Sequence, residues 1–334
     1  MSSRFRVSRR QFLASSAAGA AALTLPGRAA FAQSFPDHNI NITIPTGEGG
    51  GADRDVRLIT QIWKKYLNTD FEFGYYPGAA GQVGYEFFMK REPDGYNLLF
   101  ANMGPEVIML TLQNVGIQLG KDLVYINQTS SEPMSVFVGK RSKFQSLQEL
   151  VDEGKKRAIT CSVSRLPHPA SIGMLALGEA TGANFNLVPF GGGNPSAMAA
   201  ITGEVDCCAL PFANPITLGS EVRILGVFSD KNPAPDQSGD APTVNSVFGT
   251  KLPELTSSRG FAVQAAAMEK FPDRIETIKK TCAQVLADPD YVEAVQKAGL
   301  PKEFIDPGDQ QKAMSTAEAT RELAEKYRAL LTGK

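Results

Sequence analysis

The sequence predicts an α/β protein of two domains, each with a mainly parallel sheet flanked by helices. Short apolar strands alternate with helical segments along most of the chain. Glycine-rich turns join a strand to a helix twice within residues 45–84, and the alternation resumes with different residues after residue 136. Residues 33–334 are long enough to bury two separate cores.

The first glycine-rich turn is Pro45–Asp53, P-T-G-E-G-G-G-A-D. The preceding segment, Asn39–Ile44, alternates apolar and polar residues as a half-buried strand does. The following segment, Ala52–Leu67, carries apolar residues at helical spacing. Glycines let a backbone approach a ligand closely, and the N–H groups at a helix start favour an anion. We therefore expect an anion-binding turn here.

The second turn, Pro77–Gly84, lies between an expected strand at Phe71–Tyr75 and a helix at Val83–Lys90. A further strand is expected at Asn97–Phe100. In a parallel sheet, successive strand-to-helix turns open at the same, carboxyl, edge. One pocket at that edge can therefore use both turns.

The second domain is predicted from a further series of alternating segments. The expected strands and helices are 136–138, 147–156, 158–163, 172–181, 187–190, 195–201, 205–210 and 222–228. Residues 230–258, rich in proline, glycine and polar residues, read as a surface connection back to the first sheet, which Gly260–Gln264 would rejoin. Helices at 272–286, 290–298 and 308–331 complete the expected chain.

Residues 1–32 have the features of a twin-arginine signal peptide. Arg9 and Arg10 precede the small and apolar run Ala14–Leu25, and Ala30-Phe31-Ala32 offers an A-x-A cleavage site. We expect export by the twin-arginine route, cleavage after Ala32, and a periplasmic location.

Composition argues against several classes of partner. Removal of residues 1–32 takes away five arginines and no acid, leaving 29 basic against 35 acidic residues, a net charge of −6. This charge disfavours nucleic acid and anionic membranes as partners. The four cysteines lack a C-x-x-C motif and the two histidines lie far apart, so we expect buried thiols, no metal site and no cofactor.

The same glycines also fit a dinucleotide-binding motif. Gly47–Ala52 matches G-x-G-x-x-A after a strand, and Asp70 or Glu72 lies where a ribose ligand would be expected. Pro45 and Thr46 separate the strand from the glycines, however, and the second turn has no role in such a site. A periplasmic Rossmann-type NAD(P)-dependent oxidoreductase is kept as the alternative. A hydrolase is disfavoured, since G-x-S-x-G and H-E-x-x-H are both missing from the sequence.

A third possibility is a non-enzymatic binding protein, which an ordered set of motifs favours. The motifs are Pro45, Gly49, Gly50, Asp53 and Arg57, then Pro77-Gly78-Ala79, Pro93-Asp94-Gly95-Tyr96, Val188-Pro189-Phe190-Gly191-Gly192, Gly203-Glu204-Val205-Asp206 and Ala241-Pro242-Thr243-Val244. Together they resemble the substrate-binding proteins of tripartite tricarboxylate transporters, the Bug receptors. The resemblance runs from about Phe35 to the C-terminus.

This resemblance implies a two-lobed periplasmic-binding-protein (Venus flytrap) architecture. Lobe 1 would comprise residues 33–129 and 257–334, and lobe 2 residues 130–256, with a hinge near Ser130 and Ser257. The receptor would close on a carboxylate-bearing ligand and deliver it to the membrane subunits of the transporter, or feed a sensor kinase. We expect a monomer.

The family holds its ligands largely by main-chain N–H groups, so candidate ligand-binding residues transfer by position. They are Thr46, Glu48, Gly49, Gly50, Gly51, Gly78, Ala79, Ala80, Ser162, Ser164, Ser171, Phe190, Gly191 and Gly192.

Several residues depart from the family pattern. Glu48 stands where the family has a neutral residue, and it would repel an anion if it faced the ligand. Ala80 replaces a glycine, and Ser171 stands where many members carry histidine. Phe190-Gly191-Gly192 replaces Y-K-G and removes a cation. We therefore expect a less basic lobe 2, matching a ligand whose far end is neutral or apolar. Asp53 is expected to complement the helix dipole, and Trp63 to lie in the core.

Overall fold

A computed structural model describes residues 35–332. The predicted signal peptide, residues 1–32, lies outside the described residues. Residues from His38 onward form one compact unit, which the following paragraphs describe. None of the helices in the described part of the chain is long and apolar enough to cross a membrane.

Lobe 1 is built on strands that follow the predicted order. Strand β2 (Phe71–Tyr75) has the predicted bounds, β1 (Ile40–Ile44) begins one residue later than predicted, and β3 (Asn97–Asn102) extends two residues beyond its prediction. β1 pairs in parallel with both β2 and β3. Helices α2 (Gly51–Leu67) and α3 (Gln82–Met89) follow the two glycine-rich turns, with the 3-10 turn η2 (Ala79–Gly81) before α3.

Lobe 2 repeats the arrangement. β6 (Ile159–Val163) pairs in parallel with β7 (Phe185–Pro189) and β8 (Cys207–Pro211), and β9 (Val222–Phe228) lies beside β5. Helices α5 (Leu147–Gly154), α6 (Pro169–Thr181) and α7 (Gly193–Thr202) connect them. The expected surface connection contains two short helices, α9 (Pro235–Ser238) and α10 (Val244–Phe248).

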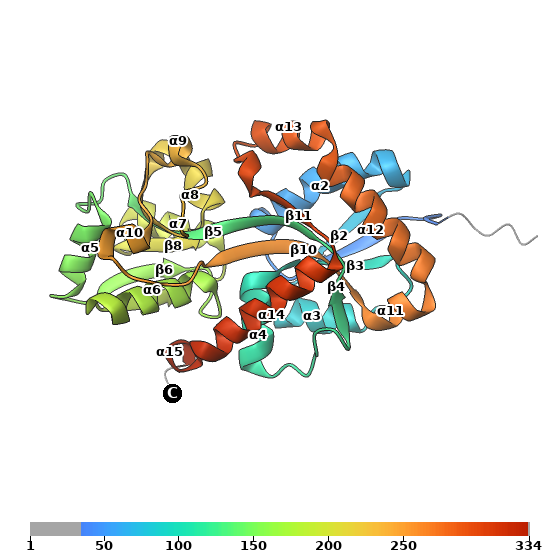
Figure 1. Cartoon of the computed structure of the whole chain (residues 1–334), viewed down its shortest axis with the longest axis horizontal. Helices are drawn as coiled ribbons and strands as arrows, with labels where there is room; N and C mark the ends of the chain where they lie inside the picture. The colour runs from blue at the N-terminus through green and yellow to red at the C-terminus, as the bar shows by residue number, and fades with distance from the viewer. Residues whose placement is uncertain (1–34, 333–334) are drawn as a thin grey trace, which may run out of the picture. The chain divides into compact units, whose positions relative to one another are not determined.

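Two long strands run through both lobes (Figure 1). β5 (Gln128–Gly139) and β10 (Thr256–Gln264) pair antiparallel, with Ser257 opposite Glu132 and Arg259 opposite Ser130. The sheet order is β2-β1-β3-β10-β5-β8-β6-β7. Every strand pair that involves β5 or β10 is antiparallel. β5 carries the chain from lobe 1 to lobe 2, and β10 carries it back. The sheet is therefore mixed, with parallel pairing around β1 and β6.

Two helices that the sequence did not predict follow strands at the carboxyl edge. α4 (Met103–Gln113) begins directly after β3, and α8 (Ala213–Leu218) begins after β8. Pro105 and Pro215 lie in the first turns of these helices, where a missing N–H costs nothing. Lobe 1 also contains β4 (Leu123–Tyr125) and β11 (Ile305–Gly308).

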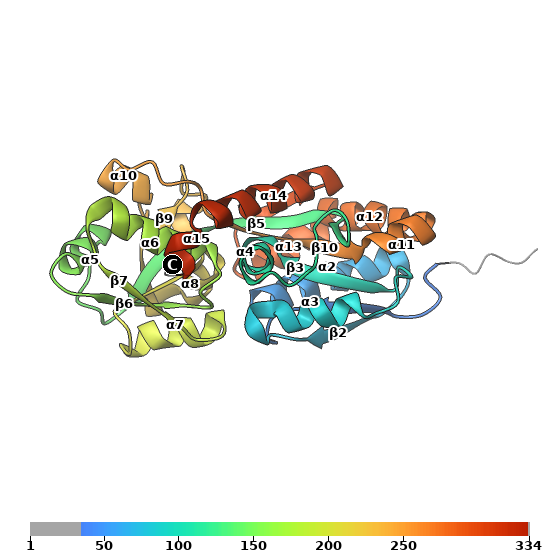
Figure 2. The ribbon, with the colours of Figure 1, turned by 90° about the horizontal axis from the view of Figure 1, so that it is seen from below.

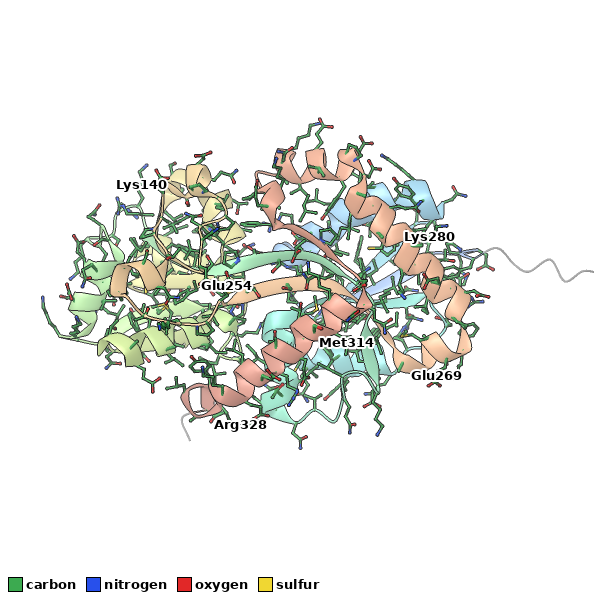
Figure 3. All side chains as sticks on the ribbon, viewed as in Figure 1. Lys140, Glu254, Glu269, Lys280, Met314 and Arg328 are labelled. Carbon is green, nitrogen blue, oxygen red and sulfur yellow. The ribbon has the colours of Figure 1, made fainter. Side chains whose placement is uncertain are left out.

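The C-terminal part packs on both lobes. Helices α11 (Ala265–Lys270), α12 (Pro272–Ala287) and α13 (Pro289–Lys297) stay with lobe 1, where α12 and α13 pack on α2. α14 (Gln310–Lys326) packs on α4, and α15 (Arg328–Thr332) reaches α6 of lobe 2. Figure 2 shows this segment lying along one side of both lobes, and Met314 and Arg328 mark its course in Figure 3. The predicted single helix is thus two helices, broken at Tyr327.

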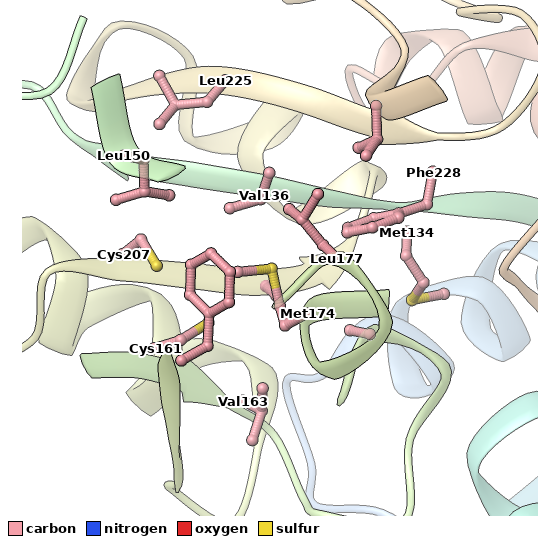
Figure 4. Close-up of a cluster of buried hydrophobic side chains, with 14 of the residues drawn as sticks. Met134, Val136, Leu150, Cys161, Val163, Met174, Leu177, Cys207, Leu225 and Phe228 are labelled. Atoms are coloured by element: carbon pink, nitrogen blue, oxygen red, sulfur yellow. The ribbon is translucent and has the colours of Figure 1, made fainter. Parts of the chain in front are cut away.

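The lobe 2 core lies between α6 and strands β5, β6 and β8. Met134, Val136, Cys161, Val163 and Cys207 contribute side chains to it (Figure 4). All four cysteines are free and buried, as predicted. Trp63 is fully buried in lobe 1, with its indole N–H donating to Thr281, which confirms its predicted core position.

Candidate ligand-binding cleft

A cleft of about 470 Å³ opens between the lobes at the carboxyl edge of the sheet. Lobe 1 contributes the first glycine-rich turn and part of the second. Lobe 2 contributes the loop from Ser164 to His168 and the turn from Gly191 to Pro195. Arg259 and Ser257 of β10 also line the cleft. No group of three or more His, Cys, Asp or Glu within residues 35–332 could hold a metal ion.

Two of the helices that begin at the cleft, α6 and α8, have N–H groups that are capped by the chain's own side chains. At α4, the Glu106 carboxylate accepts the backbone N–H of the N-cap residue Asn102 at 2.9 Å, and the Asn102 side chain makes no capping bond. His168 Nδ1 accepts the N–H of Ala170 at the start of α6, and Glu132 accepts the first N–H of α8. These helix ends have no free donors to offer at the capped positions.

Helices α2 and α7 are different. Their N-caps are Gly50 and Gly192, and neither has a side-chain cap among the described residues. The first residues of both helices line the cleft, α2 from lobe 1 and α7 from lobe 2. Unsatisfied N–H groups and the positive dipole end make each of these termini a place for an anion.

Asp53 fixes the geometry of the first turn. Its carboxylate accepts the backbone N–H of Gly49 at 2.8 Å and bonds to Arg57 and Tyr75 at 2.6 Å each. Burial opposes ionisation, but the hydrogen bonds from Tyr75, Gly49 and Arg57 hold the pKa of Asp53 below its usual value. Asp53 therefore supports the turn with its charge. Both of its carboxylate oxygens accept hydrogen bonds from the turn, Arg57 or Tyr75.

Glu48 borders the cleft but its carboxylate is paired. Oε1 accepts from the Arg57 guanidinium at 3.2 Å, and the side chain is 69% exposed. Water and Arg57 together screen its charge from the cleft. The repulsion between Glu48 and an anionic ligand, which the sequence suggested, is therefore small.

Thr46 places an unused polar group at the cleft. Its Oγ1 is buried and has no hydrogen-bond partner within the described chain, although the residue lines the cleft. A buried hydroxyl without a partner costs free energy, so such a group points to a missing partner.

The second turn is held in an unusual conformation. Ala79 and Ala80 have φ of 50° and 59°, in the left-handed region that favours glycine, and Gly81 has φ of 103°. A Cβ on Gly84 would lie 2.8 Å from Pro45, so the two glycine-rich turns approach closely. Ala80 lines the cleft, whereas Gly78 and Ala79 are exposed outside its lining.

The lobe 2 candidates also divide into residues that line the cleft and residues that do not. Ser164, Gly191 and Gly192 line the cleft. Ser162 is fully buried and its hydroxyl donates to Ser196 C=O at 2.7 Å. Phe190 packs against the core beside α7. Among the lobe 1 candidates, Thr46, Glu48, Gly50 and Gly51 line the cleft, and Gly49 lies just outside the lining.

Two arginines were missed by the sequence analysis. Arg259 forms ion pairs with Asp55 at 2.8 Å and Glu132 at 2.7 Å, and its Nε donates to Asn102. The available signal was a cation directly before the apolar segment 260–263. Arg165, in the loop after β6, supplies a cation to a lobe that was expected to be less basic. Both charges are balanced by carboxylates, so neither is a free counter-ion for a ligand.

His168 also lines the cleft, beside these arginines. Burial, and then the charges of Arg165 and Arg259, lower its pKa to about 3. Because Nδ1 accepts from Ala170, the ring is neutral with its proton on Nε2. The capping bond gives His168 a structural role at the start of α6.

Comparisons with known proteins agree with this geometry. A family model described as "Tripartite tricarboxylate transporter family receptor" matches residues 59–326, and one for the twin-arginine translocation signal matches residues 6–26. A UPF0065 protein of Agrobacterium vitis is 27% identical over 282 residues, covering 83% of this chain and 80% of the relative.

Two solved structures share the fold. An R. palustris protein solved with adipate has a TM-score of 0.77 at 20% identity and covers 90% of this chain and 98% of its own. MatC from Rhodopseudomonas palustris, solved with bound malate, has a TM-score of 0.73 at 18% identity and covers 89% and 100%. These similarities confirm the predicted α/β periplasmic-binding-protein fold.

Proposed function

Because the chain belongs to the receptor family of tripartite tricarboxylate transporters, we propose that its cleft captures a small organic acid and delivers it to the membrane subunits of such a transporter. Members of this family are solute-binding receptors and not enzymes, so the oxidoreductase alternative is set aside.

The uncapped start of α2 is the observation that carries the proposal. Gly51 and Ala52 lie at this helix start and line the cleft, and Asp53 keeps the preceding turn in place. A ligand carboxylate there would accept main-chain N–H groups and complement the helix dipole. Thr46 also lines the cleft, and its unpartnered hydroxyl would supply one more donor.

The uncapped start of α7 receives the far end of the ligand. Its glycines provide N–H groups without a free cation, so this end binds a second acid group or a neutral acceptor. The proteins solved with adipate and malate bind acids that a cleft of about 470 Å³ would accommodate. The remaining sequence candidates, Gly49, Gly78, Ala79, Ser162, Ser171 and Phe190, would support the turns and loops that carry these contacts.

Ligand capture would close the lobes about the two crossing strands. The paired segment of β5 and β10, which contains Ser130 and Ser257, is the proposed hinge between residues 33–129 with 257–334 and residues 130–256. α14 and α15 pack on both lobes, so closure would also bend the chain near Tyr327.

The twin-arginine signal accounts for the place of action. We infer export through that route, cleavage after Ala32, and function in the periplasm as a monomer.

A thermal-shift assay on mature protein tests the function. An acid at 100 times its dissociation constant adds about 2.7 kcal/mol to the native state. For a chain of this size that raises Tm by about 5–10 °C. We expect such a shift from a member of a panel of mono- and dicarboxylates, aromatic acids and acidic amino acids, and none from NAD or NADP. A shift with a nicotinamide cofactor alone would overturn the proposal.

A further inference from the structure

Arg165 belongs to lobe 2, but its guanidinium bonds to lobe 1. Nη1 donates to the backbone C=O of Ala80 at 2.6 Å, and Nη2 lies 3.8 Å from Oε1 of Glu106. The Arg165 side chain is only 15% exposed and Glu106 is fully buried. The pair therefore crosses the cleft where little water can screen it.

The base of Arg165 is held firmly in lobe 2. Its backbone C=O accepts the Ser171 hydroxyl at 3.2 Å, and Ser171 is fully buried in α6. Prolines at 167 and 169 flank the residue that caps α6, His168. The loop thus presents the arginine from a fixed position, and Ser171 serves that loop instead of the cleft.

The acceptors in lobe 1 are in place independently of Arg165. Glu106 also accepts from Asn102, through its backbone and side-chain amides, and from Tyr85. Burial raises the pKa of Glu106, and the charge of Arg165 acts in the opposite direction. Within the described residues, Arg165 is the cation paired with this carboxylate.

Ala80 connects the pair to the ligand site. It lines the cleft and occupies the left-handed region, as Ala79 does, which L-residues disfavour. A hydrogen bond to its C=O favours that turn over competing conformations. Opening of the lobes would remove the bond, because Arg165 moves with lobe 2.

We propose that Arg165 is a positioning residue that stabilises the closed cleft and, through Ala80, sets the second glycine-rich turn for the ligand. This inference rests on the proposed function. Arg165 acts on binding through closure: when fewer molecules are closed, apparent affinity falls by the same factor.

The experiment measures lobe separation and affinity together. Spin labels are attached through Glu86→Cys on α3 and Met198→Cys on α7, both exposed, while the native cysteines are buried. Distance distributions are recorded for the full mature chain with and without adipate, or the acid that gives the largest thermal shift. Arg165→Ala is compared with Arg157→Ala, which loses an ion pair to Asp206 within lobe 2.

For Arg165→Ala we expect the closed-to-open ratio without ligand to fall about tenfold, as a lost interaction of about 1.4 kcal/mol produces, and affinity to fall in proportion to the closed fraction, by up to the same factor. Arg157→Ala should change neither. Since Arg165→Ala leaves Glu106 unpaired, a second variant combines Arg165→Met with Glu106→Gln and keeps the core neutral. It should retain the wild-type Tm and still favour the open form.

Unchanged distance distributions in both Arg165 variants would overturn the proposal, and a loss of affinity without a change in distances would assign Arg165 to the ligand directly and overturn it as well. The ligand-free distances test the inference even if no acid binds. Failure of every acid with wild-type protein would instead count against the proposed function.

Discussion

The carboxylate of Asp53 accepts the backbone N–H of Gly49, four residues earlier, at 2.8 Å. This bond folds the glycine-rich turn back onto the first turn of α2 and uses the acid of that helix for structure. The N–H groups of Gly51 and Ala52 are left for a ligand. The binding geometry of lobe 1 therefore depends on backbone conformation at a few glycines.

Gly50→Val tests the importance of close approach at this turn. Gly50 has φ of −81°, which valine adopts, and a Cβ would meet Gly47 C=O at 3.3 Å. We expect a folded protein by circular dichroism whose affinity for the acid falls at least tenfold (about 1.4 kcal/mol). Gly182→Ala is the control, since it strains a helix end away from the cleft. It should lower Tm without changing affinity; normal binding by Gly50→Val would place the ligand elsewhere.

Thr46→Val replaces an unpartnered hydroxyl with a methyl group of similar size. Because Oγ1 has no partner within the described chain, ligand-free Tm should stay the same or rise. Affinity should fall by about fivefold, the value of one neutral hydrogen bond of about 1 kcal/mol. Titration calorimetry and thermal melting measure the two effects. A lower Tm with unchanged affinity would show that the hydroxyl serves the fold.

His168→Asn changes the response to acid. The pKa of His168 is lowered to about 3, against about 6.5 in an unfolded chain, so between these values only the unfolded state binds the proton. Stability is therefore lost as pH falls below about 6.5, by up to about 1.4 kcal/mol per pH unit. Asparagine keeps the cap on α6 but does not titrate. Urea unfolding from pH 4 to 7 should show a shallower slope for the variant; identical slopes would contradict this assignment.

The export route is tested by changing Arg9 and Arg10 together to lysine. The twin-arginine pattern is the feature that its translocase recognises, so precursor should accumulate in the cytoplasm. Immunoblots of periplasmic and cytoplasmic fractions measure the change, with Arg4→Lys as the matched control. Unaltered periplasmic yield of the double variant would refute the route.

Local patterns predicted most of the fold. The alternating Ile40, Ile42 and Ile44 predicted β1 to within one residue, and both glycine-rich turns lie before helices as expected. The long strands β5 and β10 were predicted too short, because their polar residues are satisfied only in the tertiary structure. Glu132 on β5 and Arg259 on β10 pair with each other across the crossing, which no local pattern reveals.

The sequence predicted the glycine-rich turns that line the cleft, but it predicted only some of the lining side chains. Glycines at strand-to-helix turns carry their own signal, because their backbone freedom is the reason for their presence. Arg165 carries none, since its role depends on Ala80 and Glu106, which are distant in sequence. A contact between the lobes can be predicted only when the relative position of the two lobes is known, and local sequence patterns do not give that position.

The central claim is that the open helix starts of α2 and α7 bind the ligand. A crystal structure of the mature protein with the acid that gives the largest thermal shift tests it most directly. We expect a carboxylate oxygen within about 2.7–3.2 Å of the N–H of Gly51 or Ala52, and the opposite end of the acid at Gly193 or Asn194. An acid bound outside the cleft, or within it with both helix starts unengaged, would contradict the account.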